Sequence, residues 1–355
     1  MLRKLARIST AHRITSIADF ISSRYGKSGR LAVAVTLMAV IGTTPYIALQ
    51  LKAVASTFVA VTGAPGGPET GWIFADTALW VAICMALFAI VFGTRRVGAD
   101  EHHPGIVAAV AFESLVKLMA LMSVGLLVVL VLGPGPDGVF ARGAARADEL
   151  SYLWTFRDDF GARWTTVLFL AGAAIICLPR QFHVTFVEND DSRNLKSARW
   201  LFPGYLIAIN IFVVPIAIAG ILLFGGDPAV NPDTFVLTLP LLGGENWLAV
   251  FAFVGGLSAS TGMVIVSCVA VSTIVCNDLV MPLLLRSHQL QGRFAGHVIH
   301  VLLPIRPSAI LAIPFLPYGF HPFLSEPYAL AAHQPLACAS VASSCPRRTP
   351  PLSRT

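Results

Sequence analysis

Long apolar runs separated by short polar segments dominate the chain up to about residue 290. A helix needs roughly 20 apolar residues to cross about 30 Å of hydrocarbon. Six runs approach or exceed this length, and they cover about residues 31–61, 77–93, 106–132, 164–187, 201–224 and 247–285. The pattern therefore predicts an all-α polytopic membrane protein with about six transmembrane helices.

Some of these runs contain residues that disturb a regular helix. Gly42 and Pro45 lie in the first run, so we expect a kink there. The fourth run is expected to continue past Pro179, whose missing N–H group leaves backbone atoms inside the span unpaired. In the sixth run, Gly255 and Gly262 are expected soft points.

The apolar runs divide the chain into three parts. Residues 1–30 form a basic segment, residues 31–290 a six-helix membrane region, and residues 291–355 a tail. Ten of the 23 prolines fall between Pro304 and Pro351, so we expect a poorly ordered tail without a seventh span.

Composition supports the membrane interpretation. Charged residues make up 12% of the chain and hydrophobic residues 55%, with a mean hydropathy of +0.73. A soluble domain carries about 25% charged residues. The net charge of +6 lies in short loops between apolar runs, which disfavours nucleic-acid binding. The lipid bilayer is therefore the expected partner.

The sequence offers no pattern typical of an enzyme or of a metal site. Four cysteines lie inside apolar runs, where Cys behaves as a small hydrophobic residue, and no Cys-x-x-Cys pair occurs. The pair His102-His103 is interpreted as part of a loop, because adjacent histidines do not share one side of a helix. We expect neither catalysis nor a bound cofactor.

Lys and Arg residues predict the orientation. With the N-terminus inside, the inner segments hold seven, two, four and two of these residues, and the outer loops hold zero, four and zero. Inner loops of membrane proteins carry the excess of Lys and Arg. The N-terminus is therefore expected in the cytoplasm of a bacterial cell, with the chain in the inner membrane.

Four segments of the sequence resemble the sodium:solute symporter family. They are Ile14-Thr-Ser-Ile-Ala-Asp-Phe-Ile-Ser-Ser-Arg-Tyr-Gly26, Thr77-Ala-Leu-Trp80, Gln181-Phe-His183 with the following 194–199, and Asn277-Asp278-Leu279. The resemblance covers about residues 14–290, and the order and spacing of the segments carry it more than any single one.

Five further stretches resemble a subfamily in which the symporter part is fused to a sensor histidine kinase. They are residues 46–54, 101–105, 111–117, 177–183 and 261–266. No kinase sequence follows in this chain, so kinase activity is expected only of a domain that is not present here.

The resemblance implies a fold of two inverted repeats of five helices, with substrate and ion held at broken helices near the midplane. Segment 14–26 would follow the second core helix, and the sixth run would be the eighth. The chain then corresponds to a partial fold, and we interpret it as an internal fragment.

Ser260 and Thr261 form the candidate ion site, because the family has a Ser-Thr or Ser-Ser pair for Na⁺ on this helix. That pair is normally about sixteen residues before the terminal Asp, and here it lies about two positions earlier. Either the helix has a local irregularity or the sodium site is degraded. The alternative role of these small residues is close helix packing.

Arg180, Gln181 and His183 are the candidate substrate-binding residues, because the resemblance implies that the broken helix after Pro179 faces the substrate. An arginine at membrane depth suggests a water-filled cavity. The alternative is an ordinary helix end at the inner surface, with Arg180 extending toward water.

Three further charges lie inside apolar runs, at Lys52, Glu113 and Lys117. Glu113 and Lys117 are four residues apart with Glu first, which is the favoured order for a helical ion pair. Such a pair could clamp helices together or belong to a polar path, and Lys52 could reach the same Glu113.

Three functions remain open on this basis. The first is Na⁺-coupled uptake of a small solute, such as an amino acid. The second is a membrane sensor that reports a solute to a kinase. The third is a non-functional fragment, and for the chain as printed we expect no transport on its own.

Overall fold

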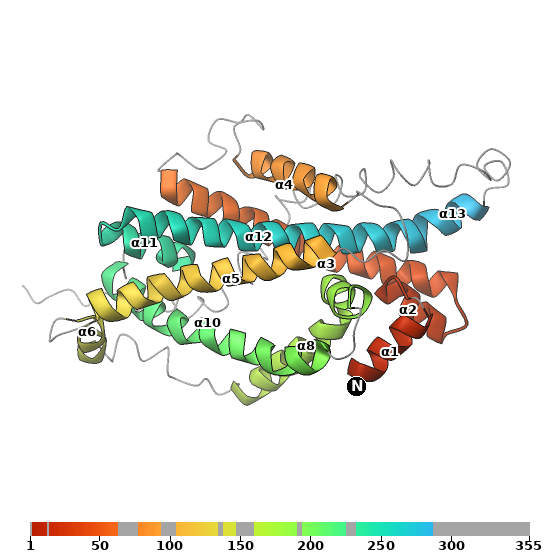
Figure 1. Ribbon diagram of the computed structural model, residues 1–355, viewed down its shortest axis with the longest axis horizontal. Helices are drawn as coiled ribbons and strands as arrows, with labels where there is room; N and C mark the ends of the chain where they lie inside the picture. The colour runs from red at the N-terminus through yellow and green to blue at the C-terminus, as the bar shows by residue number, and fades with distance from the viewer. Residues whose placement is uncertain are drawn as a thin grey trace, which may run out of the picture.

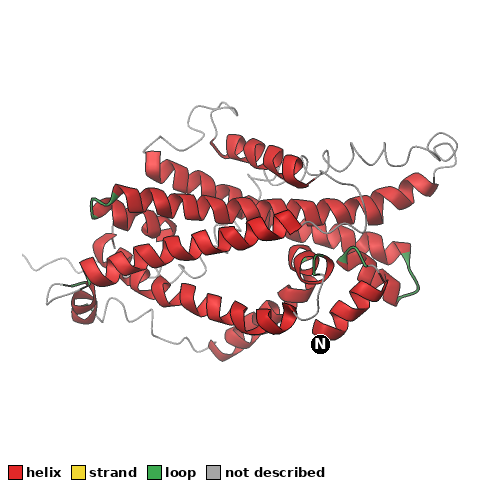
Figure 2. Ribbon diagram, viewed as in Figure 1, coloured by secondary structure: helices red, strands yellow, loops and turns green. Residues whose placement is uncertain are grey.

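The computed structural model describes residues 2–12, 14–62, 77–93, 104–133, 138–146, 160–189, 194–224 and 232–286. Within these ranges every regular element is helical and no strand occurs (Figure 2). The prediction of an all-α fold is confirmed to this extent. The tail 291–355 and the pair His102-His103 lie outside the described residues.

Each of the six predicted runs contains a helix. These helices are α3 (Gly29–Thr62), α4 (Thr77–Gly93), α5 (Pro104–Leu127), α8 (Phe160–Cys177), α10 (Asn194–Phe224) and α12 (Asn246–Ile274). Four of them (α3, α5, α10 and α12) are long and apolar enough to cross a membrane. The bent pair that begins with α8 adds a fifth span if it is counted as one. Helix α4 has 17 residues, or about 25 Å, so the count of six stays a prediction.

The broken helix at Pro179, which the resemblance implies, is present. Helix α8 ends at Cys177, and the chain continues as α9 (Pro179–Phe182) and the π-helical segment η3 (His183–Val187), bent by 55°. Leu178 between them is extended, as expected for a residue before proline. Helix α3, in contrast, is helical without interruption through Gly42 and Pro45, so these residues do not end it.

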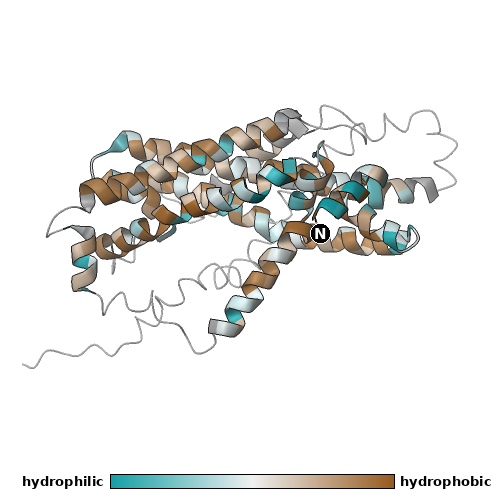
Figure 3. Cartoon of the chain, turned by 60° about the horizontal axis from the view of Figure 1, so that its bottom comes forward, coloured by the Kyte–Doolittle hydropathy of each residue, from teal (hydrophilic) through white to brown (hydrophobic). Residues whose placement is uncertain are grey.

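Helix α12 forms the centre of the molecule. It contacts α5, α3, α11 (Phe235–Leu242) and α4 (Figure 1). Of its most apolar stretch 67% is buried, against 17–28% for α3, α5 and α10. Most of the apolar surface of the outer helices is exposed, and hydrophilic residues are most frequent at helix ends and turns (Figure 3). This distribution fits a protein whose outer helices face lipid.

Two glycines allow α5 to approach α12 closely. A Cβ atom at Gly255 would lie 2.6 Å from the Cβ of Ala120, and one at Gly262 would overlap the carboxylate of Glu113. Small residues on this helix therefore permit close packing, as one of the sequence interpretations expected. The contact also places a charged side chain of α5 directly against the backbone of α12.

Several short elements were not predicted. The basic N-terminal segment contains α1 (Leu2–His12) and α2 (Ile17–Arg24), and the loop after the third run contains α6 (Val139–Ala145). The loop before α12 contains η4 (Pro232–Thr234) and α11, whose apolar residues pack against α5 and α10. Helix α5 continues into η2 (Val128–Leu132), and α12 continues into η5 (Val275–Val280) and α13 (Met281–Arg286).

Candidate functional site

Five residues from four helices meet near the middle of α3 and α12. They are Tyr46 of α3, Glu113 and Lys117 of α5, Arg180 of α9 and Gly262 of α12, and we name them the central polar cluster. The structure thus brings together three of the predicted residues: Arg180, Glu113 and Lys117. Charged side chains are costly at this depth, so their convergence distinguishes the site from the surrounding apolar packing.

Arg180 enters the cluster because the chain bends at Pro179. Its Nη1 donates a hydrogen bond to the Tyr46 hydroxyl at 2.5 Å, and its guanidinium carbon lies 4.7 Å from the Tyr46 ring centroid. The same hydroxyl is 2.7 Å from the sulfur of Met263 on α12. Arg180 is half-buried. The bent span is therefore joined to α3 and α12 through one tyrosine.

Glu113 lies against α12 and close to the other charges of the cluster. Its half-buried carboxylate faces Gly262, and it interacts electrostatically with both Lys117 and Arg180. Glu113 and Lys117 thus influence each other electrostatically, but the described residues show no ion pair within 4 Å between them. Lys52 is exposed on α3, and no contact in the described residues joins it to Glu113.

A second polar feature lies about one helical turn from Glu113. His183 Nε2 is 3.3 Å from Glu188 Oε1, and both side chains line a small cavity of about 40 Å³. The other lining residues are valines of α5, η3 and α12: Val107, Val110, Val184, Val266 and Val269. The cavity is large enough for a few water molecules.

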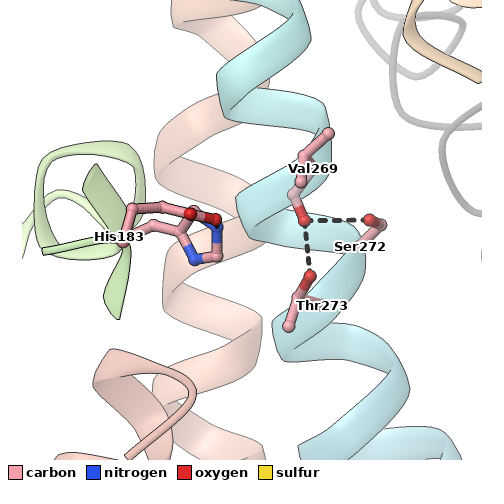
Figure 4. A network of polar contacts seen from close by, with 5 residues as sticks. His183, Val269, Ser272 and Thr273 are labelled. Atoms are coloured by element: carbon pink, nitrogen blue, oxygen red, sulfur yellow. Dashed lines mark hydrogen bonds and ion pairs between the residues drawn. The ribbon is translucent and has the colours of Figure 1, made fainter. Parts of the chain in front are cut away.

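Figure 4 shows how the His183 side chain turns toward α12. On that helix the carbonyl of Val269 accepts hydrogen bonds from the hydroxyls of Ser272 at 2.9 Å and Thr273 at 2.8 Å (Figure 4). These hydroxyls are satisfied within their own helix. Gln181 is half-buried, and it makes no hydrogen bond or ion pair with another described residue.

The two hydroxyl residues predicted to bind the ion, Ser260 and Thr261, lie next to Gly262 of the cluster on α12. Ser260 is 8% exposed and makes no hydrogen bond to another described residue, whereas Thr261 donates to the carbonyl of Leu257 at 2.7 Å. The π-helical η5 begins after this pair and contains Asp278 itself. A π turn takes up about one residue more than an α turn, so positions within η5 are shifted relative to a regular α-helix. The helix thus has a local irregularity of the kind that the sequence left open.

At the far end of α12, two segments 262 positions apart in sequence are joined. The Ser16 hydroxyl donates to Asp278 Oδ2 at 2.8 Å and accepts from the backbone N–H of Asp19 at 2.9 Å, which caps α2. Asn277 Nδ2 donates to the Thr15 hydroxyl at 3.3 Å. Around this contact, apolar residues of α1, α2, α9, η3 and α12 form one buried cluster. We name the hydrogen-bonded contact between these two segments the Ser16–Asp278 contact.

Replacing Ser16 with alanine should lower the free energy of unfolding by about 1–2 kcal/mol, because α2 loses its cap and Asp278 loses a donor. Thermal unfolding of the purified protein in detergent measures this effect. The control is Ser23→Ala, since the exposed Ser23 donates only to the nearby carbonyl of Phe20. Equal loss in both variants would show that the Ser16–Asp278 contact contributes nothing specific.

Two members of the cluster were missed as functional residues by sequence reasoning. The sequence indicates Tyr46 only as the first residue of a resembling stretch, and Gly262 only as a soft point, as a small residue for close helix packing and as part of the stretch 261–266. The available signal was a tyrosine one residue after Pro45 in the middle of an apolar run. Sequence spacing could not show that α3 and α9, 134 positions apart, would meet there.

Comparison with known proteins gives no match: no family model, no curated protein and no solved structure matches the chain. Function is therefore inferred from the residues themselves and from their arrangement.

Proposed function

We propose that the chain is the membrane part of a secondary transporter of the sodium:solute symporter type. Its activity would be Na⁺-coupled uptake of a small solute, such as an amino acid, in a bacterial inner membrane. The observation that carries the proposal is the bend at Pro179, which places Arg180 against Tyr46 and near Glu113. Transporters of the inverted-repeat type hold substrate at such broken helices near the midplane. The central polar cluster is the proposed solute site.

Contacts between the resembling segments support this proposal. Segment 14–26 is joined to 277–279 by the Ser16–Asp278 contact. The ring of Phe20 in the first segment lies 5.9 Å from that of Phe182, which belongs to segment 181–183. Three of the four segments by which the sequence resembles the family are therefore neighbours in space, as expected for parts of one fold.

The proposed coupling ion is Na⁺, held in part by Ser260 and Thr261. Purified protein should bind the standard radiolabelled amino acids more tightly in NaCl than in KCl, and the variant Ser260→Ala should lose this difference. Ser260 is suited to ion binding because its hydroxyl is buried and makes no other bond to the described residues. The control is Ser258→Ala on the same helix. Equal binding in both salts would contradict Na⁺ coupling.

The proposed orientation places the N-terminus in the cytoplasm. In a cysteine-free background, Thr70→Cys should react with a membrane-impermeant maleimide added outside the cell, and Ser192→Cys should react only after lysis. The reason is the excess of Lys and Arg in the segment that contains Ser192. Labelling of Ser192→Cys in intact cells would overturn the proposed orientation.

A sensor is the second candidate, and one observation favours it. Every residue of the central polar cluster lies in a stretch that resembles the kinase-fused subfamily: 46–54, 111–117, 177–183 and 261–266. A sensor has to bind the solute but need not accumulate it. Because this chain is not expected to transport on its own, binding is the test: equal amino-acid affinity in NaCl and KCl would favour the sensor, and tighter binding in NaCl would favour the transporter.

A further inference from the structure

We propose that the central polar cluster binds the carboxylate group of its solute between Arg180 and Lys117. This assignment deepens the proposed function and rests on it, since it takes the cluster to be the solute site. It narrows the solute to anionic or zwitterionic compounds and excludes neutral sugars and polyols as the preferred ligands.

The charges of the cluster are the first reason to assign a carboxylate to this site. Glu113 supplies one negative charge, and Lys117 and Arg180 supply two positive charges that both act on it. The other acidic residues of the described ranges lie in the Ser16–Asp278 contact (Asp19 and Asp278), opposite His183 (Glu188), in η4 (Asp233) and at the start of α12 (Glu245). Counted by formal charge, Glu113, Lys117 and Arg180 together carry one excess positive charge near the middle of apolar helices. An unbalanced charge in such surroundings is costly, and a carboxylate would balance it.

The geometry of Arg180 is the second reason for a carboxylate site. One of its terminal nitrogens donates to Tyr46, and the Tyr46 ring lies against the guanidinium group. A guanidinium group has five N–H donors in a planar fork that fits a carboxylate in a bidentate manner. Tyr46 thus orients the fork and leaves further donors for a ligand, while Lys117 adds a second positive charge.

The cavity lined by His183 and Glu188 is the third reason, because it offers space for the rest of the solute. Val110 and Val266 line it, and they lie about one turn from Glu113 and Gly262 of the cluster. Its walls are mainly valine side chains, with His183 and Glu188 as the polar members. A small apolar or weakly polar solute group fits such a space better than a strongly hydrated one. A carboxylate head with a short side group matches both parts of the site.

The test is a binding measurement on the purified full chain in lipid nanodiscs. The probes are the standard amino acids, and the matched probes are their amides, which keep the amino group and side chain but lack the carboxylate. At least one amino acid should bind, and its amide should bind about ten- to a hundred-fold more weakly. Equal affinity for an acid and its amide, or no binding of any acid, would overturn the assignment.

Charge variants show where the carboxylate binds. Arg180→Gln should weaken acid binding about ten- to a hundred-fold and weaken amide binding much less. Glu113→Gln should tighten acid binding, because it increases the positive excess; a purely structural role of the cluster would not produce this gain. Lys52→Gln is the control, since Lys52 is exposed and outside the cluster. Unchanged acid binding in Arg180→Gln would contradict the proposal.

Failure of this assignment can be distinguished from failure of the proposed function. Na⁺-dependent binding with equal affinity for acid and amide, unchanged in Arg180→Gln, would support a sodium symporter whose solute site lies elsewhere. Carboxylate binding that requires Arg180 but is the same in NaCl and KCl would confirm the site and contradict Na⁺ coupling.

Discussion

Replacing Gly262 with valine should disrupt both the packing of the chain and its central polar cluster. A side chain at this position would occupy the space of the Glu113 carboxylate, so α5 or Glu113 has to move. Overpacking of this kind costs about 1–3 kcal/mol, and displacement of Glu113 adds the loss of its interactions with Lys117 and Arg180. We expect a clearly lower thermal unfolding midpoint in detergent and loss of solute binding.

The control for this prediction is Gly256→Val. Gly256 lies on the same helix, and no atom lies within 4 Å of a Cβ built there. Both variants introduce the same residue into the same helix, so differences in helix propensity cancel. A Gly262→Val protein as stable as Gly256→Val would show that Glu113 does not rest against α12 as described.

Replacing Arg180 with glutamine should also lower the thermal unfolding midpoint strongly, because it removes two interactions with Tyr46. A hydrogen bond from a charged donor contributes about 1.5–3 kcal/mol, and a cation–π contact contributes about 0.5–2 kcal/mol. Tyr46→Phe removes the hydroxyl and keeps the ring, so it should lose only the first of these. Thermal unfolding of both variants and of the double variant separates the two contributions.

Arg199→Gln is the matched control for Arg180. Arg199 lies 5.6 Å from the ring of Trp200, and both residues are exposed. An exposed cation–π contact is worth little, so this variant should unfold close to the wild-type temperature. If Arg180→Gln and Arg199→Gln shift the unfolding midpoint equally, the contact between α9 and α3 does not hold the cluster together.

The helical architecture could be predicted from the sequence because hydrocarbon imposes a simple rule on long apolar runs. All six runs contain a helix, and the run 77–93 coincides with α4. The bend at Pro179 was also predictable, since proline removes a donor and disfavours helix in the preceding residue. Pro45 shows the limit of that rule, because the helix around it continues without interruption.

The candidate site could be predicted only in part. Arg180, Glu113 and Lys117 were recognisable as charges in apolar runs, but their convergence depends on how α5 and α9 pack. Lys52 has the same signature in sequence and nevertheless lies on an exposed side of α3. The Ser16–Asp278 contact joins residues 262 positions apart, and no local pattern encodes such a pairing. Periodicity identifies a helix but does not give its neighbours.

The most direct measurement of the central claim is the distance between a bound solute and Arg180. Solid-state NMR can detect dipolar coupling between amino acids labelled with ¹³C at the carboxyl group and protein labelled with ¹⁵N at its arginine side chains, in lipid bilayers. The account predicts strong coupling in the wild-type protein and in Lys52→Gln, and its loss in Arg180→Gln. Bound solute without such coupling, or coupling that persists in Arg180→Gln, would contradict a solute site at the central polar cluster.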